Sequence, residues 1–152
     1  MTGKITSKKF FIIILITLHL SLLADNFIKF NEIAFLQKAN KSKEVINLSI
    51  ALAKTPAQQR KGLMKVNKMD EFQGMLFIFH KEDHRIFWMK DTYIPLDLIF
   101  LNKNKVIVGI VENNKPMSEK NIKIKKKAQY ILELNAGFVK KYGVELGDKL
   151  IQ

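Results

Sequence analysis

The chain has 152 residues, with 26 lysines and arginines against 14 aspartates and glutamates, which gives a formal net charge of +12. It contains no cysteine, and this excludes disulfides, thiol catalysis and metal sites built on thiolates. Hydrophobic residues make up 47% of the sequence. A chain of this length and composition can bury a core without a covalent cross-link.

Residues 1–24 have the features of a secretory signal peptide. Three lysines form a basic start, residues 10–23 form an apolar run, and Ala24 supplies a small residue before the polar Asp25. This order is typical of a signal that is cleaved, here after Ala24. The apolar run is shorter than the ~20 residues that span a bilayer, so we expect no permanent membrane span after cleavage. We therefore expect an exported protein, periplasmic or extracellular, with one β-rich domain over residues 25–152.

Cleavage of this signal would remove Lys4, Lys8 and Lys9 and lower the net charge from +12 to +9. A charge of this size favours anionic partners, such as membrane surfaces, anionic polymers or nucleic acid. The basic residues are nearly all lysines and are scattered, apart from a group at residues 123–127, which is also typical of a solvated surface. Because we expect export, we do not expect nucleic acid as a partner.

The first part of the expected domain has the pattern of a hairpin followed by a short helix. Residues 46–53 alternate between large apolar and smaller or polar side chains, which is the period of a half-buried strand. Residues 27–36 precede them across a polar turn and are expected to pair with them. Thr55 and Gln58 then have the spacing of a capping box, which predicts the start of a helix. Gly62 is expected near its end.

Short apolar runs separated by turn residues fill the rest of the chain. The clearest pattern is a hairpin of residues 94–101 and 106–111 across an Asn-Lys-Asn-Lys turn. The other expected segments are strands over 75–79, 85–89, 128–134 and 149–151, a charged turn over 80–84, and a helical turn over 138–142 closed by Gly143. This pattern predicts a mainly β fold, a compact β-sandwich or barrel with two short helices.

Several motifs follow one another with an order and spacing that resemble a known family. They are residues 60–64 (RKGLM), 74–79 (GMLFIF), 87–92 (FWMKDT), 94–97 (IPLD) and 130–137 (YILELNAG). With these motifs the chain resembles the domain-of-unknown-function 192 family over about residues 45–152. The resemblance implies a compact β-rich fold, frequent export and no established activity. The family usually has asparagine where this chain has Asp91, which leaves the role of this side chain open.

The densest of these motifs, residues 87–97, suggests a binding pocket. On an extended chain Trp88 and Lys90 share one face. The indole ring would then offer a stacking platform, and the ammonium group would pair with an anion. The alternative interpretation places Trp88 and Met89 in the core, beside a turn at residues 91–92.

Two carboxylates, Asp97 and Glu133, fall within apolar strands. A buried carboxylate is costly unless it is paired or hydrogen-bonded. The candidate partners of Asp97 are Arg60, Arg85 and Lys90. A structural ion pair is one interpretation of Asp97, and a raised pKa for acid–base catalysis is the other. The alternation of residues 130–134 places Glu133 on the same strand face as Ile131.

We expect an exported binding domain with a pocket formed by Arg60, Trp88, Lys90, Asp97 and Glu133. Its ligand would be an anionic or polar small molecule, or a polysaccharide of the cell envelope. The alternative is a hydrolase that acts on an envelope polymer through Asp97 and Glu133 as paired carboxylates, so whether the domain is an enzyme stays open. We expect a monomer with no cofactor and no metal, since the methionines that would suit Cu(I) lie in separate motifs.

Overall fold

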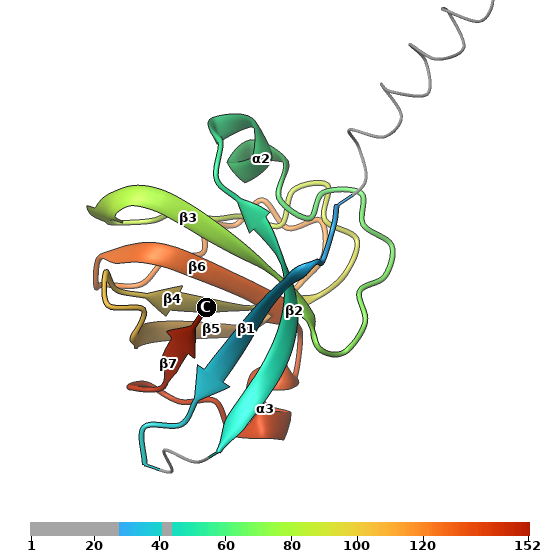
Figure 1. The fold of residues 1–152 in the computed structure, drawn as a ribbon. Helices are drawn as coiled ribbons and strands as arrows, with labels where there is room; N and C mark the ends of the chain where they lie inside the picture. Colours follow the sequence, from blue (N-terminus) through green and yellow to red (C-terminus); the bar gives the residue numbers. More distant parts are fainter. Residues whose placement is uncertain (1–27, 41–43) are drawn as a thin grey trace, which may run out of the picture.

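The computed structural model describes residues 28–40 and 44–152 (Figure 1). The expected signal peptide over residues 1–24 lies outside these residues. Within the described part of the chain, no helix combines the length and the hydrophobicity needed to cross a membrane.

The described residues form seven strands and two short helices, so the protein is mainly β, as the sequence predicts. The strands are β1 (Glu32–Gln37), β2 (Val45–Ala53), β3 (Gln73–Asp83), β4 (Leu96–Leu101), β5 (Ile107–Asn114), β6 (Ala128–Asn135) and β7 (Lys149–Ile151). The helices are α2 (Pro56–Lys61) and α3 (Phe138–Tyr142). All seven strands belong to one sheet, in the order β5-β4-β6-β3-β2-β1-β7.

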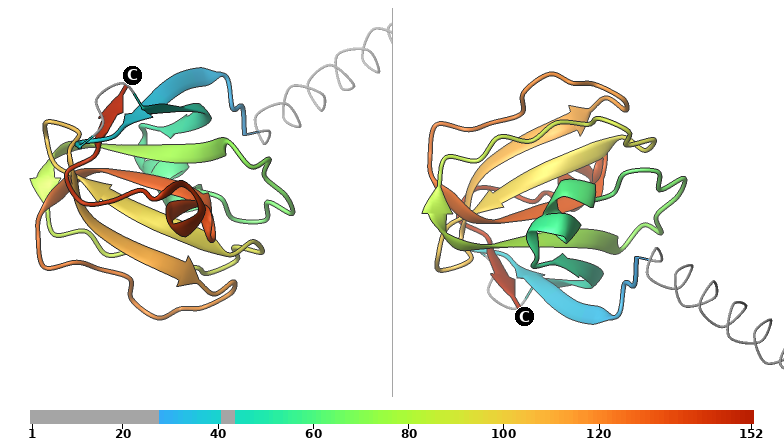
Figure 2. Two further views of the ribbon diagram at one scale, coloured as in Figure 1. Left: turned by 90° about the horizontal axis from the view of Figure 1, so that it is seen from below. Right: turned by 90° about the horizontal axis from the view of Figure 1, so that it is seen from above.

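The sheet curls until its two edges meet at one end, which gives a partly closed barrel (Figure 2). β7 pairs with β1. β7 and the residue before it also contact the chain that leads into β5. Val106 forms a bridge with Lys149. The amide of Leu150 donates to the carbonyl of Lys105 at 2.9 Å, and the amide of Ile107 donates to the carbonyl of Asp148 at 2.8 Å. The predicted sandwich or barrel is therefore a single curled sheet.

Both faces of this sheet are apolar and covered. β4 is buried at all six positions, and alternate residues enter two different clusters. Ile99 and Leu101 pack in an α3-side core that includes Phe138 and Val139. The residues of β4 that point the other way pack in an α2-side core, which the chain after α2 and the chain before β4 cover. Its members from these segments are Leu63, Met69, Met89, Ile94, Leu96, Leu98 and Phe100.

Local sequence signals were reliable where the contacts are short-range. The amide of Gln58 donates to the Thr55 hydroxyl at 3.2 Å, and the amide of Thr55 donates to the Gln58 side-chain carbonyl at 3.0 Å. This is the predicted capping box of α2. The two predicted hairpins also form, β1 with β2 and β4 with β5. α3 ends at Gly143, which adopts the left-handed conformation. A glycine at this position predicted such a helix end.

Two of the elements predicted for residues 80–89 are wrong. The segment 80–84 was expected to be a turn, but β3 continues to Asp83, which pairs with Ala128 after a bulge. This part of β3 is largely solvent-accessible, so its charged side chains are compatible with a strand. The segment 85–89 was expected to be a strand, but only Phe87 forms a bridge, with Ile122. A run of charged residues therefore does not indicate a turn where a strand extends beyond the core.

Asp97 connects three parts of the fold. Its side chain is 0% exposed. One carboxylate oxygen accepts from the amide of Asn113 in β5 at 2.8 Å, and the other accepts from the amide of Val139 in α3 at 3.0 Å. The expected ion pair with Arg60, Arg85 or Lys90 is therefore wrong, because backbone amides take that place. A carboxylate that accepts two amide hydrogen bonds satisfies groups that a five-residue helix and an edge strand would otherwise leave unpaired.

Asp97→Asn is expected to lower the free energy of unfolding by about 1–3 kcal/mol, because the amide nitrogen replaces an acceptor and leaves one buried amide unsatisfied. Urea denaturation followed by circular dichroism measures this loss. Asp70→Asn changes an exposed carboxylate and serves as the matched control, with an expected change within about 0.5 kcal/mol. Equal stability of the two variants would contradict a structural role for Asp97.

Candidate functional site

A cleft of about 610 Å³ lies beside α2, on the side of the sheet that carries the α2-side core. One wall is α2 with the residues that follow it, and the other wall is the chain from Ile86 to Thr92. The right-hand view of Figure 2 shows α2 lying over the sheet next to β3. The cleft is lined by Pro56, Gln59, Arg60, Lys61, Gly62, Leu63, Met64, Phe77, Phe79, Ile86, Phe87, Trp88, Lys90, Asp91, Thr92 and Glu133.

Four of the five residues expected in a pocket line this cleft. They are Arg60, Trp88, Lys90 and Glu133, and they come from a helix, a loop and a strand that are distant in sequence. Asp97 is not among them, because its side chain points into the α3-side core, where it accepts its two backbone hydrogen bonds. The structure therefore brings together the two cations, the indole and one carboxyl group.

α2 is held in place by two sets of contacts, and these position Arg60. The capping box fixes the first turn, and the Gln59 side-chain amide donates to the carbonyl of Ile78 in β3 at 2.8 Å. Arg60 lies in the last turn of α2, where a cation is favoured by the helix dipole. The guanidinium therefore stands on an anchored helix rather than on a loop, which suits binding of an anion.

Trp88 and Lys90 share one side of the loop wall, as the alternation predicted. Trp88 is 50% exposed, whereas Met89 between them is buried in the α2-side core. The interpretation that placed both Trp88 and Met89 in the core is therefore wrong for Trp88. The Lys90 ammonium lies 5.8 Å from the Trp88 ring centroid and 3.6 Å from a carboxylate oxygen of Glu119. A half-exposed indole ring beside an ammonium group is available to a ligand.

A tight turn ends this wall and sets the backbone conformation of Asp91. The amide of Thr92 donates to the carbonyl of Met89 at 3.1 Å. Asp91, the third residue of the turn, has a φ of 53°, which is the feature of a type II turn. Asparagine and aspartate both tolerate this left-handed conformation better than most side chains. Asp91 therefore serves the turn through its backbone conformation, which asparagine would also adopt.

The two walls of the cleft are joined by one hydrogen bond. The amide of Lys65 donates to the carbonyl of Asp91 at 2.8 Å. Lys65 also has a positive φ, 62°. Non-glycine residues in this conformation cost about 1–3 kcal/mol each and cluster at functional sites. The strain at Lys65 and Asp91 lies where the walls meet, so it contributes to the shape of the cleft.

Glu133 forms part of the cleft floor. It pairs across the sheet with Met75 in β3 and Leu98 in β4, and both neighbours belong to the α2-side core. Glu133 is only 5% exposed, and burial raises the pKa of its carboxyl to about 8. Among the described residues, no charge or hydrogen bond counteracts this effect. At neutral pH the carboxyl therefore keeps its proton and offers a hydrogen-bond donor to the cleft.

The hydrolase hypothesis required Asp97 and Glu133 to act on one bond, and the sheet places them on opposite faces. Asp97 pairs with Leu134, and its neighbour Leu98 pairs with Glu133. Since cross-strand partners share a face and successive residues alternate, the two carboxylates point to different cores. They therefore do not form the carboxylate pair of a glycosidase.

Metal binding has little support in the described part of the chain. No group of three or more histidine, aspartate or glutamate side chains is arranged there to hold a metal ion. Met64 lines the cleft, whereas Met75 and Met89 are buried in the α2-side core. The three thioethers therefore fill space in two different environments.

Sequence reasoning missed the apolar part of the cleft. Phe77, Phe79 and Phe87 line it, and their rings pack edge to face, with Phe87 5.0 Å from Phe77 and 6.3 Å from Phe79. Gly62 was expected only as the end of the helix and not in the cleft, where its φ of 47° and closeness to the Phe77 ring leave little room for a side chain. The position of Gly62 after a capped helix was the available signal, since it marks where the chain turns toward the sheet.

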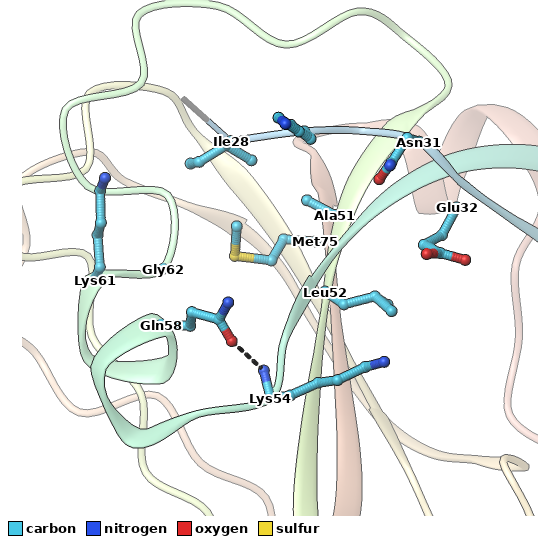
Figure 3. Close-up of a pocket in the computed structure, with 11 residues that line it drawn as sticks. Ile28, Asn31, Glu32, Ala51, Leu52, Lys54, Gln58, Lys61, Gly62 and Met75 are labelled. Carbon is cyan, nitrogen blue, oxygen red and sulfur yellow. Dashed lines mark hydrogen bonds between the residues drawn. The ribbon is translucent and has the colours of Figure 1, made fainter. Parts of the chain in front are cut away.

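A smaller cleft of about 400 Å³ lies between α2 and the chain that leads into β1 (Figure 3). Met75 and Ala51 form its base, Ile28 lies above them, and Gln58 and Lys61 border it from α2. None of the five residues expected from the sequence lines this cleft. The cleft of about 610 Å³, which four of these five residues line, is therefore the candidate site.

Glu133→Gln is expected to remove a pH dependence of stability. In the wild type, the free energy of unfolding should fall as the pH rises from about 4.5 to about 8, because the unfolded chain releases this proton and the folded chain retains it. The fall contributed by Glu133 has a slope of up to about 1.4 kcal/mol per pH unit. Urea denaturation at pH 5 and pH 8 compares the wild type with Glu133→Gln. Glu112→Gln, an exposed control, should keep the wild-type slope, and a Glu133→Gln variant that also keeps it would contradict the assignment.

Asp91→Asn is expected to leave stability within about 0.5 kcal/mol of the wild type. Asp91→Val is expected to lower it by about 1–3 kcal/mol, because a β-branched residue resists the left-handed conformation. Thermal or urea denaturation of the two variants measures the difference. If the valine variant were as stable as the asparagine variant, the turn would not be what position 91 requires.

Comparison with known proteins places this fold and cleft in a family. The model of the DUF192 family, described as "Uncharacterized ACR", matches residues 36–152. A solved structure from Sinorhizobium meliloti 1021, described as a "putative transcription regulator", is similar, with 40% identity and a TM-score of 0.76 over 79% of this chain and 92% of that chain.

A second similar structure is a protein of unknown function from Novosphingobium aromaticivorans DSM 12444. It has 29% identity and a TM-score of 0.74, over 79% of this chain and 84% of that chain. A search of curated proteins gave no match. The family model covers more than half of the sequence and agrees with the motifs and the fold, and the chain therefore belongs to the DUF192 family.

Proposed function

We propose that this protein is an exported binding domain whose cleft holds a ligand with an anionic group next to a ring. The observation that carries this proposal is the convergence of Arg60, Trp88, Lys90 and Glu133 on one cleft of about 610 Å³. Ligand sites typically combine an apolar lining with a few polar groups that fix orientation. Export is supported by the basic, apolar and small-residue order of residues 1–24.

The chemistry of the cleft suits such a ligand in three ways. Arg60 and Lys90 offer charge-assisted hydrogen bonds to a carboxylate or a phosphate. The half-exposed Trp88 ring offers a flat apolar surface with ring edges accessible. Glu133, protonated at neutral pH, would donate a hydrogen bond to an oxygen that enters the cleft. A neutral acid at the floor does not repel an anion held at the rim.

Nucleic acid is not part of the proposal, although the similar chain from Sinorhizobium meliloti 1021 is described as a regulator of transcription. Recognition of DNA by a helix requires an element that extends along the major groove. The two helices among the described residues have six and five residues. The description therefore applies to that protein and is not carried over to this chain.

Binding is expected to change the fluorescence of Trp88, which is the only tryptophan in the sequence. Glucuronate and glucose 6-phosphate test the anionic requirement, and glucose is the neutral comparison. Lys90→Gln and Arg60→Gln are each expected to weaken binding of the anionic ligands roughly 5- to 30-fold, because each removes a charge-assisted contact of about 1–2 kcal/mol. Calorimetry confirms the affinities.

Lys103→Gln is the matched control, because Lys103 is exposed in the β4–β5 turn and should not affect binding. A fluorescence change that Lys103→Gln alters as much as Lys90→Gln would point to general surface charge and count against the cleft. The absence of any change with all anionic ligands would refute the proposal for these ligand classes.

A further inference from the structure

A third cleft adjoins the candidate site and extends it. Its volume is about 970 Å³, and it shares Arg60, Lys61, Met64 and Asp91 with the candidate site. Its remaining lining comes from the chain before β1, from α2 and from the chain after α2. These residues are Ile28, Phe30, Ala57, Lys65, Val66, Asn67 and Lys68. Lys65 of this cleft donates its amide to the carbonyl of Asp91, which lines both clefts. The two adjoining clefts are together called the extended groove.

Cations follow this groove along its length. Lys90 lies in the candidate site, Arg60 lies where the two clefts meet, and Lys65 and Lys68 lie in the adjoining cleft. Among the described residues that line the adjoining cleft, Asp91 is the one with an acidic side chain. A series of separated positive charges favours a ligand with several anionic groups over a single ion.

Apolar surface alternates with these charges. Trp88 and Ile86 line the candidate site, Met64 lines both clefts, and Phe30 and Val66 line the adjoining cleft. Trp88 and Ile86 are exposed, so their surfaces are available to rings that have an apolar face. A chain of rings that each carry an anionic group matches both the charges and the apolar positions.

We propose that the two clefts bind a single acidic oligosaccharide, which runs from Trp88 and Lys90 past Arg60 to Lys65 and Lys68. This inference rests on the proposed function, and it adds the ligand class and the direction of the chain. A linear polyphosphate would satisfy the cations but would have no apolar face for Trp88, Met64 and Phe30. The surface of a membrane is flat and would leave the concave groove unfilled.

The experiment compares a disaccharide and an octasaccharide of galacturonic acid, with a neutral glucose oligomer and a linear polyphosphate of matched length. Trp88 fluorescence and calorimetry report binding to the full chain. The octasaccharide should bind at least about fivefold more tightly than the disaccharide, because it reaches two further exposed cations. Lys68→Gln should weaken the octasaccharide by about fivefold and leave the disaccharide unchanged, and Lys103→Gln should affect neither.

The outcomes separate this inference from the proposed function. If the disaccharide and octasaccharide bind equally and Lys68→Gln has no effect, the extended groove is wrong while the candidate site stands. If polyphosphate or the neutral oligomer binds as tightly as the octasaccharide, the assignment to an acidic glycan is wrong. If the two galacturonic acid oligomers fail while glucose 6-phosphate still changes the Trp88 fluorescence, the ligand class is wrong and the proposed function survives.

Discussion

A sheet that is apolar on both faces has to be covered on both, and the rest of this structure depends on that constraint. β4 is buried at every position, so water must be excluded from two sides at once. On one side the sheet covers itself by curling, and α3 fills the space with Phe138 and Val139. On the other side the cover consists of α2, the chain after it and the chain before β4. This second cover is irregular, and the candidate cleft lies where it is incomplete.

The two buried carboxylates of the central strands show how the same residue type serves different purposes on the two sides. Asp97 meets two backbone amides, so its charge is accommodated and it holds β5 and α3 in place. Glu133 meets apolar neighbours and a cleft, and burial raises the pKa of its carboxyl to about 8. The backbone of Glu133 pairs with both neighbouring strands, whereas burial of its carboxyl group is costly to the fold.

The sequence predicted those features that depend on neighbouring residues. The Thr55–Gln58 capping box, the hairpin across residues 102–105 and the left-handed glycine after α3 each follow from a few adjacent side chains, and each is present. The sequence motifs predicted the family, and the match to the family model confirms this prediction. The alternation of Trp88 and Lys90 also placed both side chains on one wall.

The features that the sequence could not supply depend on contacts between distant segments. The partners of Asp97 are amides 16 and 42 residues away, and no local pattern distinguishes them from an ion pair. The bridge from Phe87 to Ile122 replaced a strand that composition alone favoured. The opposite orientations of Asp97 and Glu133 follow from the register between β4 and β6. That register is set by the whole sheet.

The hydrogen bond from Lys65 to Asp91 has a consequence for how this fold tolerates change. It joins two connections, one between β2 and β3 and the other between β3 and β4, and neither connection supplies a strand to the sheet. Loops carried on a rigid scaffold vary more freely than the scaffold itself. Both connections also supply apolar side chains to the α2-side core, namely Leu63, Met69, Met89 and Ile94. Exchange of the two connections would therefore leave the strands in place only if the two were exchanged as a pair and these apolar positions were kept.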